Sequence, residues 1–227
     1  MATGLIPREF LSRPAQEVAP DLLGSVFEHE TADGLVAVAL TEVEAYAGEV
    51  DPASHAYRGR TGRNAVMYGP AGHAYVYFTY GMHFCVNVVC MPPGTASAVL
   101  LRAGQVIAGE ELARARRGPA STPRDLARGP ARLCQALGID RRLDGADLCD
   151  EASPLRLRKA AATVLSCWQK PAGRSEEKTV IHTGPRVGVR EGADVPWRFW
   201  LDGAASVSAY RPYVRRRRRG AAAERGE

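Results

Sequence analysis

The amino-acid sequence predicts a single domain of the α+β class, in which a β-sheet is flanked by short helices. Two patterns favour this class. Apolar runs rich in Val, Leu and aromatic residues, bounded by Gly, Pro or Asp, are typical of strands. Shorter segments with helical spacing surround them. The length of 227 residues fits one domain with a substantial core, which we expect residues 1–210 to form.

The expected strands lie, in chain order, at residues 26–30, 35–44, 74–79, 84–91, 96–102, 180–189 and 197–201. The first two are joined at Asp33-Gly34, a favoured pair for a hairpin turn. Residues 35–40 are apolar on both faces, which predicts a central strand. This strand would carry Glu44 at its C-terminal end, where burial gives way to a site.

Helical spacing is expected in residues 8–24, 107–117 and 129–137. Pro14 and Pro20 should break the first of these segments into short helical pieces. Residues 48–73 contain many Gly, Pro, Ser and Arg without a sustained period, which predicts a long loop. Loops of this length are usually functional or mobile. Residues 150–180 give no strong signal.

The net charge of +5 belongs to one end of the chain. Residues 211–227 hold seven of the 30 basic residues and two of the 25 acidic ones, so the rest of the chain is formally neutral, with 23 of each. A phosphate-binding face must therefore come from a local cluster, such as Arg58, Arg60 and Arg63. The Arg-rich segment is expected to be a disordered tail that either attaches to polyanions or serves solubility alone.

Five cysteines are present, an odd number without a Cys-x-x-Cys pair: Cys85, Cys90, Cys134, Cys149 and Cys167. Their mostly apolar neighbours suit buried thiols in a reducing cytosol, so we expect neither disulfides nor a zinc site. No stretch approaches the ~18 to 20 apolar residues that cross a bilayer, and no leader pattern is present at the N-terminus. We therefore expect a soluble cytoplasmic protein.

Chemistry-bearing side chains concentrate in one part of the sequence: Glu44, Tyr46, His55, Tyr75, Tyr77, Tyr80, Met82 and Asn87. A carboxylate, several aromatic rings and an amide are what an enzyme needs to stack a nucleobase and attack its sugar bond. Glu44 is the best candidate for a general base that takes a proton from water. The alternative is a structural Glu at a strand end, paired with Arg.

Several motifs occur in one order along residues 15–149 and 184–210: Glu44-Ala45-Tyr46, Tyr75-Val76-Tyr77, Tyr80-Gly81-Met82 with Asn87, Leu100 to Ala103, Gly129-Pro130 with Leu133 to Leu137, and Arg186 to Val189 with Arg198-Phe199. In these motifs the sequence resembles the alkyladenine (3-methyladenine) DNA glycosylase family. The resemblance implies a curved, mainly antiparallel sheet flanked by helices. It also implies a DNA glycosylase of base-excision repair that flips out alkylated or deaminated purines, namely 3-methyladenine, 7-methylguanine, hypoxanthine and ethenoadenine.

The resemblance also implies roles for the candidate residues. Glu44 would activate the attacking water, and Arg102 would help hold it together with a main-chain carbonyl near residues 187–189. Tyr46 and His55 would sandwich the flipped base. Two further residues complete the expected pocket: Tyr77, which would close it, and Asn87, which would exclude guanine by a clash with its amino group. Read from the residues alone, these Tyr could be ordinary strand residues and Asn87 a side chain that satisfies backbone groups.

The expected DNA contacts lie beside this pocket. By resemblance, Tyr80 is a wedge that fills the gap left by the flipped nucleotide, and Met82 packs against the DNA backbone. Arg58, Arg60 and Arg63 would bind phosphates. The alternatives are a turn aromatic that covers the core and a set of solvated loop charges.

No Lys stands at a motif position where it could form a Schiff base with the sugar, so the reaction should stop at an abasic site. We expect a monomer that acts on duplex DNA containing damaged purines, with no metal, organic cofactor or obligate protein partner, and that associates with the nucleoid if bacterial. The sequence departs from the family pattern at residues 56–59 and at Gly104-Gln105, which leaves the substrate range open. Two other functions remain: a non-catalytic protein that binds damaged bases, and an RNA or nucleoside N-ribohydrolase.

Overall fold

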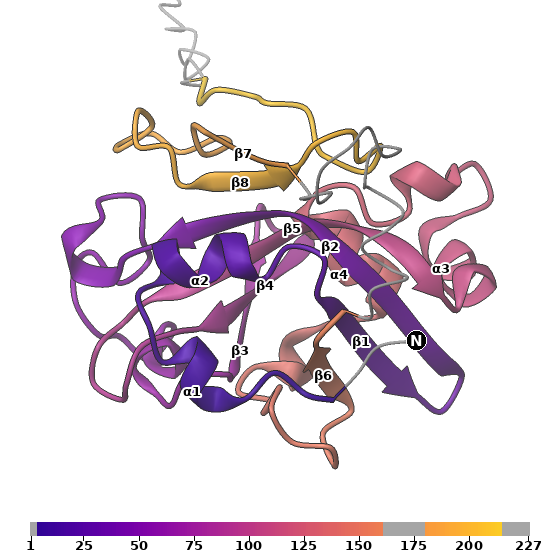
Figure 1. Cartoon of the computed structure of the whole chain (residues 1–227), viewed down its shortest axis with the longest axis horizontal. Coiled ribbons are helices and arrows are strands. Elements are labelled where there is room, and N and C mark those ends of the chain that lie inside the picture. The colour runs from indigo at the N-terminus through magenta and orange to yellow at the C-terminus, as the bar shows by residue number, and fades with distance from the viewer. Residues whose placement is uncertain (1–3, 161–179, 215–227) are drawn as a thin grey trace, which may run out of the picture.

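A computed structural model describes residues 4–160 and 180–214 (Figure 1). Its strands are β1 (Val26–Thr31), β2 (Gly34–Tyr46), β3 (Ala74–Thr79), β4 (His83–Val89), β5 (Ala98–Ala108), β6 (Leu155–Arg158), β7 (Ile181–Gly184) and β8 (Arg198–Leu201). They form one sheet in the order β3-β4-β5-β2-β1-β6, and every pairing is antiparallel. The hairpin β7–β8 joins this sheet through β8, which pairs with β2.

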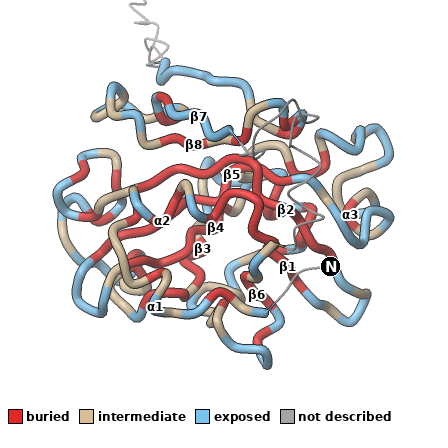
Figure 2. The backbone as a smooth tube through the Cα atoms, viewed as in Figure 1, coloured by how far each residue is buried: buried red, intermediate tan, exposed pale blue. Residues whose placement is uncertain are grey.

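The long central strand β2 organises the sheet (Figure 1). One edge of β2 pairs with β5 along almost its whole length. Its other edge pairs first with β1 and then, from Glu42 to Glu44, with β8. The strand is buried on both faces, as its apolar sequence predicts (Figure 2). This arrangement confirms the predicted α+β class and the antiparallel sheet.

Short helices cover the sheet: α1 (Arg8–Leu11), α2 (Ala15–Asp21), α3 (Glu110–Arg117) and α4 (Pro130–Leu137). Four 3₁₀ turns lie in the loops, at Gly48–Val50, Ala65–Tyr68, Pro123–Asp125 and Arg141–Leu143. Helix α2 packs against β2 and β5, and α4 packs against β4, β5 and α3. Leu11, Val18, Leu22, Leu133 and Leu137 thereby join one continuous apolar core with the strands.

Alternation along the strands gives the sheet a second face, which carries the polar side chains of the sheet beside a smaller apolar cluster. Val99 and Leu101 of β5 belong to the core, whereas Leu100 and Arg102 point to the opposite side, where they border a cavity. The same alternation holds in the neighbouring strands. Tyr75 and Tyr77 of β3, and Cys85 and Asn87 of β4, border the cavity.

A β-bulge at Thr41 decides which face of the sheet receives Glu42 and Glu44. Val36, Val38 and Leu40 belong to the core, so strict alternation would send both carboxylates there too. The pairing with β5 shifts by one residue between Leu40 and Glu42 and shifts back between Glu42 and Val43, and beyond this irregularity Val43 and Ala45 fill the core positions. As a result, Glu42, Glu44 and Tyr46 point away from the core.

Several element boundaries differ from those predicted. Residues 107 and 108 belong to β5, and α3 begins only at Glu110. Gly109 separates the two elements at φ +70°, and a Cβ there would lie 2.0 Å from the carbonyl oxygen of Leu35. This close contact between strands leaves no trace in local periodicity. Similarly, β7 covers only four residues of the predicted 180–189, because the chain turns into a loop at Pro185.

The N-terminal and central segments give further comparisons. Pro14 precedes α2 as predicted, but Pro20 does not break the helix; it lies one residue before the last residue, where few backbone hydrogen bonds remain to be lost. The strand β6 lies in residues 150–180, which gave no signal, and it forms by pairing with β1.

The cysteines follow the predicted burial. Cys85, Cys90 and Cys134 are buried free thiols, and Cys149 is a half-buried one. Cys167 and the tail from residue 215 onward lie outside the described residues. Within residues 4–160 and 180–214, no helix is long and apolar enough to span a membrane.

Candidate active site

A cavity of about 670 Å³ lies on the second face of the sheet. Its floor comes from β2, β3, β4 and β5, and its walls come from two loops, residues 52–61 and 187–191. The predicted residues that border it are Tyr46, His55, Arg58, Tyr77, Tyr80, Asn87 and Arg102. The fold therefore brings together side chains that are spread over residues 46–102 with a loop some 85 residues further along the chain.

Glu44 lies one layer beneath the cavity wall. Its Oε1 accepts a hydrogen bond from the backbone N–H of Val187 at 2.6 Å. Its Oε2 accepts one from the Tyr46 hydroxyl at 2.9 Å and one from Arg102 Nη1 at 3.1 Å. All three partners border the cavity, whereas Glu44 itself is fully buried. The sequence predicted that Glu44 lies where the buried part of the strand ends and the site begins. This was wrong, because these three groups lie between Glu44 and the cavity.

Arg102 links Glu44 to a second buried carboxylate, Glu42. Arg102 Nε donates to Glu42 Oε1 at 2.9 Å, while its Nη1 holds Glu44. Burial lowers the pKa of Arg102, but Glu44 and Glu42 raise it by more, so the guanidinium stays charged. An ion pair with Arg is also what a purely structural Glu44 would form. The distinguishing feature is that this pair adjoins a cavity.

Glu42 is the centre of a network that sequence reasoning missed. Its Oε1 also accepts hydrogen bonds from Arg198 Nε and Ser208 Oγ, both at 2.8 Å, and its Oε2 accepts one from the Ser208 N–H at 2.6 Å. Two buried carboxylates thus face two buried guanidinium groups, which balances their charge. The partners come from the far end of the chain, so no local pattern announces them.

Aromatic side chains form one wall of the cavity. The rings of His55 and Tyr77 meet edge to face at 4.5 Å, and Tyr75 stacks on Tyr77 at 5.5 Å. The imidazole Nδ1 of His55 lies 3.0 Å from the Tyr75 hydroxyl. Burial, with a smaller contribution from Arg63, lowers the pKa of His55 below its ordinary value, so the ring is neutral near pH 7. Burial, and then Cys85, raise the pKa of Tyr77, which keeps its hydroxyl protonated.

Tyr46 and Asn87 complete the polar part of the lining. Burial and the negative charge of Glu44 raise the pKa of Tyr46 well above its ordinary value, so its hydroxyl is a hydrogen-bond donor to Glu44. The Asn87 amide donates to the carbonyl of Tyr75 at 3.2 Å. Asn87 therefore satisfies a backbone group and also borders the cavity.

The predicted DNA contacts lie on the β3–β4 hairpin and in the loop of residues 48–73, and of these Tyr80 and Arg58 border the cavity. Tyr80 lies at the tip of the β3–β4 hairpin and is 85% exposed, with Met82 beside it at 67%. Tyr80 adopts φ +52°, a strained value for a bulky residue, in a turn that it shares with Gly81. Arg63 reaches back to this hairpin, donating to the Phe78 carbonyl at 3.3 Å. Neither Met82 nor Arg60 borders the cavity itself.

Buried polar residues fix the loop of residues 48–73. Asn64 donates to the carbonyls of His55 and Gly59 and accepts from the Thr61 N–H. Such side-chain bridges replace the backbone pairing that a loop lacks. The long loop is thus an ordered wall that presents His55.

A second buried ion pair, Asp51–Arg186, ties this loop to the C-terminal part of the chain. Arg186 Nη1 and Nη2 bind the two carboxylate oxygens of Asp51 at 2.6 and 2.9 Å. Arg186 directly precedes Val187, whose N–H holds Glu44. Arg186 stands in one of the motifs quoted above, yet no role was predicted for it or for Asp51. Among the described residues, no three His, Cys, Asp or Glu side chains gather in a way that suits a metal ion.

Comparison with known proteins identifies the family of this chain. Residues 9–205 match the family model described as methylpurine-DNA glycosylase (MPG). A relative from Streptomyces avermitilis is 54% identical over 94% of this chain and 95% of its own length. Relatives from Leifsonia xyli subsp. xyli and Burkholderia cenocepacia are 52% and 47% identical, covering 86% and 92% of this chain and 87% and 94% of their own lengths. All three are provisionally named 3-methyladenine DNA glycosylases. The chain belongs to the methylpurine-DNA glycosylase family.

Proposed function

We propose that this chain is a monofunctional DNA-3-methyladenine glycosylase, which flips a damaged purine out of duplex DNA and hydrolyses its N-glycosidic bond to leave an abasic site. The observation that carries the proposal is the Glu44 carboxylate, held by Arg102 and by the Val187 N–H directly beneath an aromatic cavity. Family membership and the names of the relatives support the reaction class.

Glu44 has the chemistry for the central step. A carboxylate can take a proton from the water that attacks the anomeric carbon, and its charge stabilises the positive charge that develops on the sugar. Arg102 and Val187 fix its orientation, which reduces the reorganisation needed in the transition state. Because Glu44 is fully buried, water reaches it only if a covering group moves. The Tyr46 hydroxyl is the group that we infer to move when a purine stacks on its ring.

The lining of the cavity suits a damaged purine. We propose that Tyr46 and His55 stack on the two faces of the flipped base and that Tyr77 closes the pocket. An aromatic face attracts a cationic base by ~0.5 to 2 kcal/mol, and a neutral His55 adds no repulsion. Asn87 would exclude guanine through its amino group. We include 7-methylguanine, hypoxanthine and ethenoadenine in the proposed range, although the neutral bases need protonation more than the cationic ones.

The exposed hairpin and the nearby arginines suit duplex DNA. Tyr80 would enter the minor groove as a wedge and Met82 would pack against the backbone. Phosphates would contact Arg58, Arg60 and Arg63. Every proposed group comes from one chain, so a monomer suffices. We place the activity in the cytoplasm, at the nucleoid in a bacterium.

A single substitution tests the catalytic assignment. Glu44→Gln removes the general base but keeps the shape of the side chain, so release of 3-methyladenine from alkylated DNA should fall by at least about a hundredfold, while lesion binding survives. Glu49→Gln is the matched control, because Glu49 lies five residues away on the surface and bonds only to the exposed hydroxyl of Tyr68. Release by Glu44→Gln at the wild-type rate would refute the assignment.

Two other functions would give different results in the same assays. A damage-binding protein without turnover would show no release even as wild type. An RNA or nucleoside hydrolase would act on hypoxanthine in RNA or as the free nucleoside at least as well as in a DNA duplex. Tyr80→Ala separates these further, because a wedge matters for duplex DNA and not for a nucleoside.

A further inference from the structure

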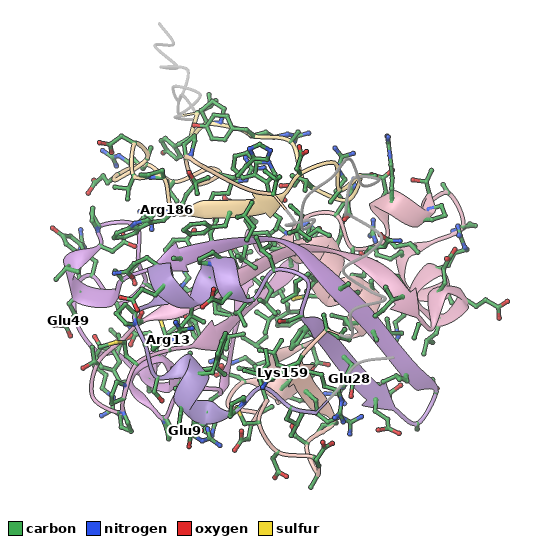
Figure 3. The ribbon with its side chains drawn as sticks, in the orientation of Figure 1. Glu9, Arg13, Glu28, Glu49, Lys159 and Arg186 are labelled. Atoms are coloured by element: carbon green, nitrogen blue, oxygen red, sulfur yellow. The ribbon has the colours of Figure 1, made fainter. Side chains whose placement is uncertain are left out.

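Arg186 occupies an unusual position behind the aromatic lining. Its side chain is fully buried, and its guanidinium lies 4.8 Å from the centre of the Tyr46 ring and 5.2 Å from that of Trp197. Figure 3 shows Arg186 where strand β8 begins. The cavity borders Tyr46 but not Arg186. Arg186 therefore lies over the Tyr46 ring without itself bordering the cavity.

The charge of Arg186 changes what the free surface of Tyr46 can attract. The face of an aromatic ring binds a cation through its negative quadrupole. A guanidinium already over the ring draws on the same electron density, and it also repels a second cation beyond the ring through a medium of low dielectric constant. A cationic purine stacked on Tyr46 feels both effects, whereas a neutral purine of the same shape feels neither.

Asp51 opposes this effect. Its carboxylate binds both terminal nitrogens of Arg186, and it is itself buried. Asp51 also accepts hydrogen bonds from the N–H groups of Ala47 and Ala53, so its position is fixed independently of Arg186. The Arg186 cation lies over the Tyr46 ring, and Asp51 pairs with it. The pair therefore contributes to the field at the ring, beside Glu44 and Arg102.

We propose that Arg186 is a specificity-determining residue: by its charge behind Tyr46 it limits the preference of the pocket for cationic over neutral purines, and Asp51 partly restores that preference. This inference rests on the proposed function, in which Tyr46 stacks on the flipped base. It explains how one aromatic pocket can accept both cationic and neutral lesions. The role concerns purine charge and not the cleavage step itself.

The test measures binding of two purines that differ only in charge. Duplexes carry either 3-methyladenine, which is cationic, or its neutral isostere 3-deaza-3-methyladenine, both on a 2′-fluoro sugar that resists cleavage. The ratio of the two dissociation constants gives the preference for the cation. Asp51→Asn leaves the Arg186 charge unopposed and should lower this preference about threefold. The double variant Asp51→Asn with Arg186→Gln removes both charges and should raise it about threefold.

The two variants are expected to change the preference for the cation in opposite directions. Damage to the fold would not do so, because it would weaken binding of both duplexes together. The double variant is used because Arg186→Gln alone leaves Asp51 buried without a counter-charge. Arg186→Lys keeps the charge and should leave the preference unchanged, and thermal unfolding confirms that each variant folds. Shifts in the same direction, or no shift in either variant, would overturn the inference.

A further variant separates this inference from the proposed function. Tyr46→Leu removes the ring and should abolish the preference for the cation. If Tyr46→Leu keeps the wild-type preference, Tyr46 is not the stacking platform, and that part of the proposed function fails. If Tyr46→Leu abolishes the preference while the Arg186 and Asp51 variants leave it unchanged, only the inference fails.

Discussion

Glu42 offers the sharpest test of how the buried charges hold the site. The substitution Glu42→Gln keeps the shape of the side chain but removes a charge that Arg102 and Arg198 share, both at hydrogen-bonding distance. The amide of Gln also carries a donor NH₂ group where Glu42 has an acceptor oxygen. This donor faces the N–H groups of Arg102 or of Ser208, which then lack an acceptor. The variant therefore leaves one buried positive charge without a partner.

The expected cost follows from the burial of the network. Glu42 is fully buried and the side chains of Arg102 and Arg198 are nearly so. Breaking a buried pair on one side costs ~3 to 5 kcal/mol. At roughly 2 to 4 °C per kcal/mol for a chain of this size, the melting temperature should fall by about 6 to 20 °C. Release of 3-methyladenine should also slow, because Arg102 loses one of the two carboxylates that hold it.

Denaturant unfolding, thermal unfolding and single-turnover release measure these effects. Glu30→Gln is the control, because Glu30 is 60% exposed and its pair with Arg156 should contribute ~1 kcal/mol or less. A loss of less than about 1 kcal/mol in the free energy of unfolding of Glu42→Gln would refute the reasoning. It would mean that water or other groups already neutralise the network.

Three further predictions concern the cavity, its mouth and the tail. Tyr80→Ala should weaken binding to lesion-containing duplexes by about tenfold or more and leave the free energy of unfolding within ~0.5 kcal/mol, because the ring is exposed; equal binding in a titration would argue against a wedge. Burial, and then Arg63, lower the pKa of His55, so its ring gains a proton only at a lower pH than an exposed histidine does. As the pH falls below neutrality, wild-type affinity for a 3-methyladenine duplex should hold until His55 gains this proton and then decline more steeply than that of His55→Gln, and identical pH profiles would contradict this. Deleting residues 212–227 should lower DNA affinity and flatten its salt dependence without changing single-turnover release, and an unaltered slope would make the tail irrelevant to binding.

Much of the fold was predictable because its signals are local. The hairpin at Asp33-Gly34 joins β1 and β2 as predicted, since turn chemistry and apolar alternation act over a few residues. The strand β6 was missed because its alternation of Leu and Arg covers only four residues, too few to indicate a strand without the pairing with β1. For the same reason, the boundary at Gly109 was placed wrongly, since it depends on a strand more than 70 residues earlier in the chain.

The candidate site likewise has residues that could be predicted from the sequence and residues that could not. Its aromatic residues, Asn87 and the pair Glu44 and Arg102 were named from motifs, and the cavity or its immediate support contains them. The positions of Met82 and Arg60 outside the cavity could not be predicted, because a motif does not say how far a side chain reaches. Glu42 and Asp51 were missed because nothing near them in the sequence distinguishes a buried acidic residue from an exposed one.

The class of the fold and the residue types of the candidate site could be predicted from the sequence, because strand periodicity, turn residues and family motifs lie in short segments. How those residues meet could not, because it depends on contacts between distant segments. An irregularity of the β2–β5 pairing around Thr41 turns Glu42 and Glu44 away from the apolar core, to the side of the sheet that carries the cavity, and Arg186 reaches Asp51 across 135 positions of the chain. Both depend on which strands and loops lie together in space, and that is set by packing of the whole domain rather than by any one segment.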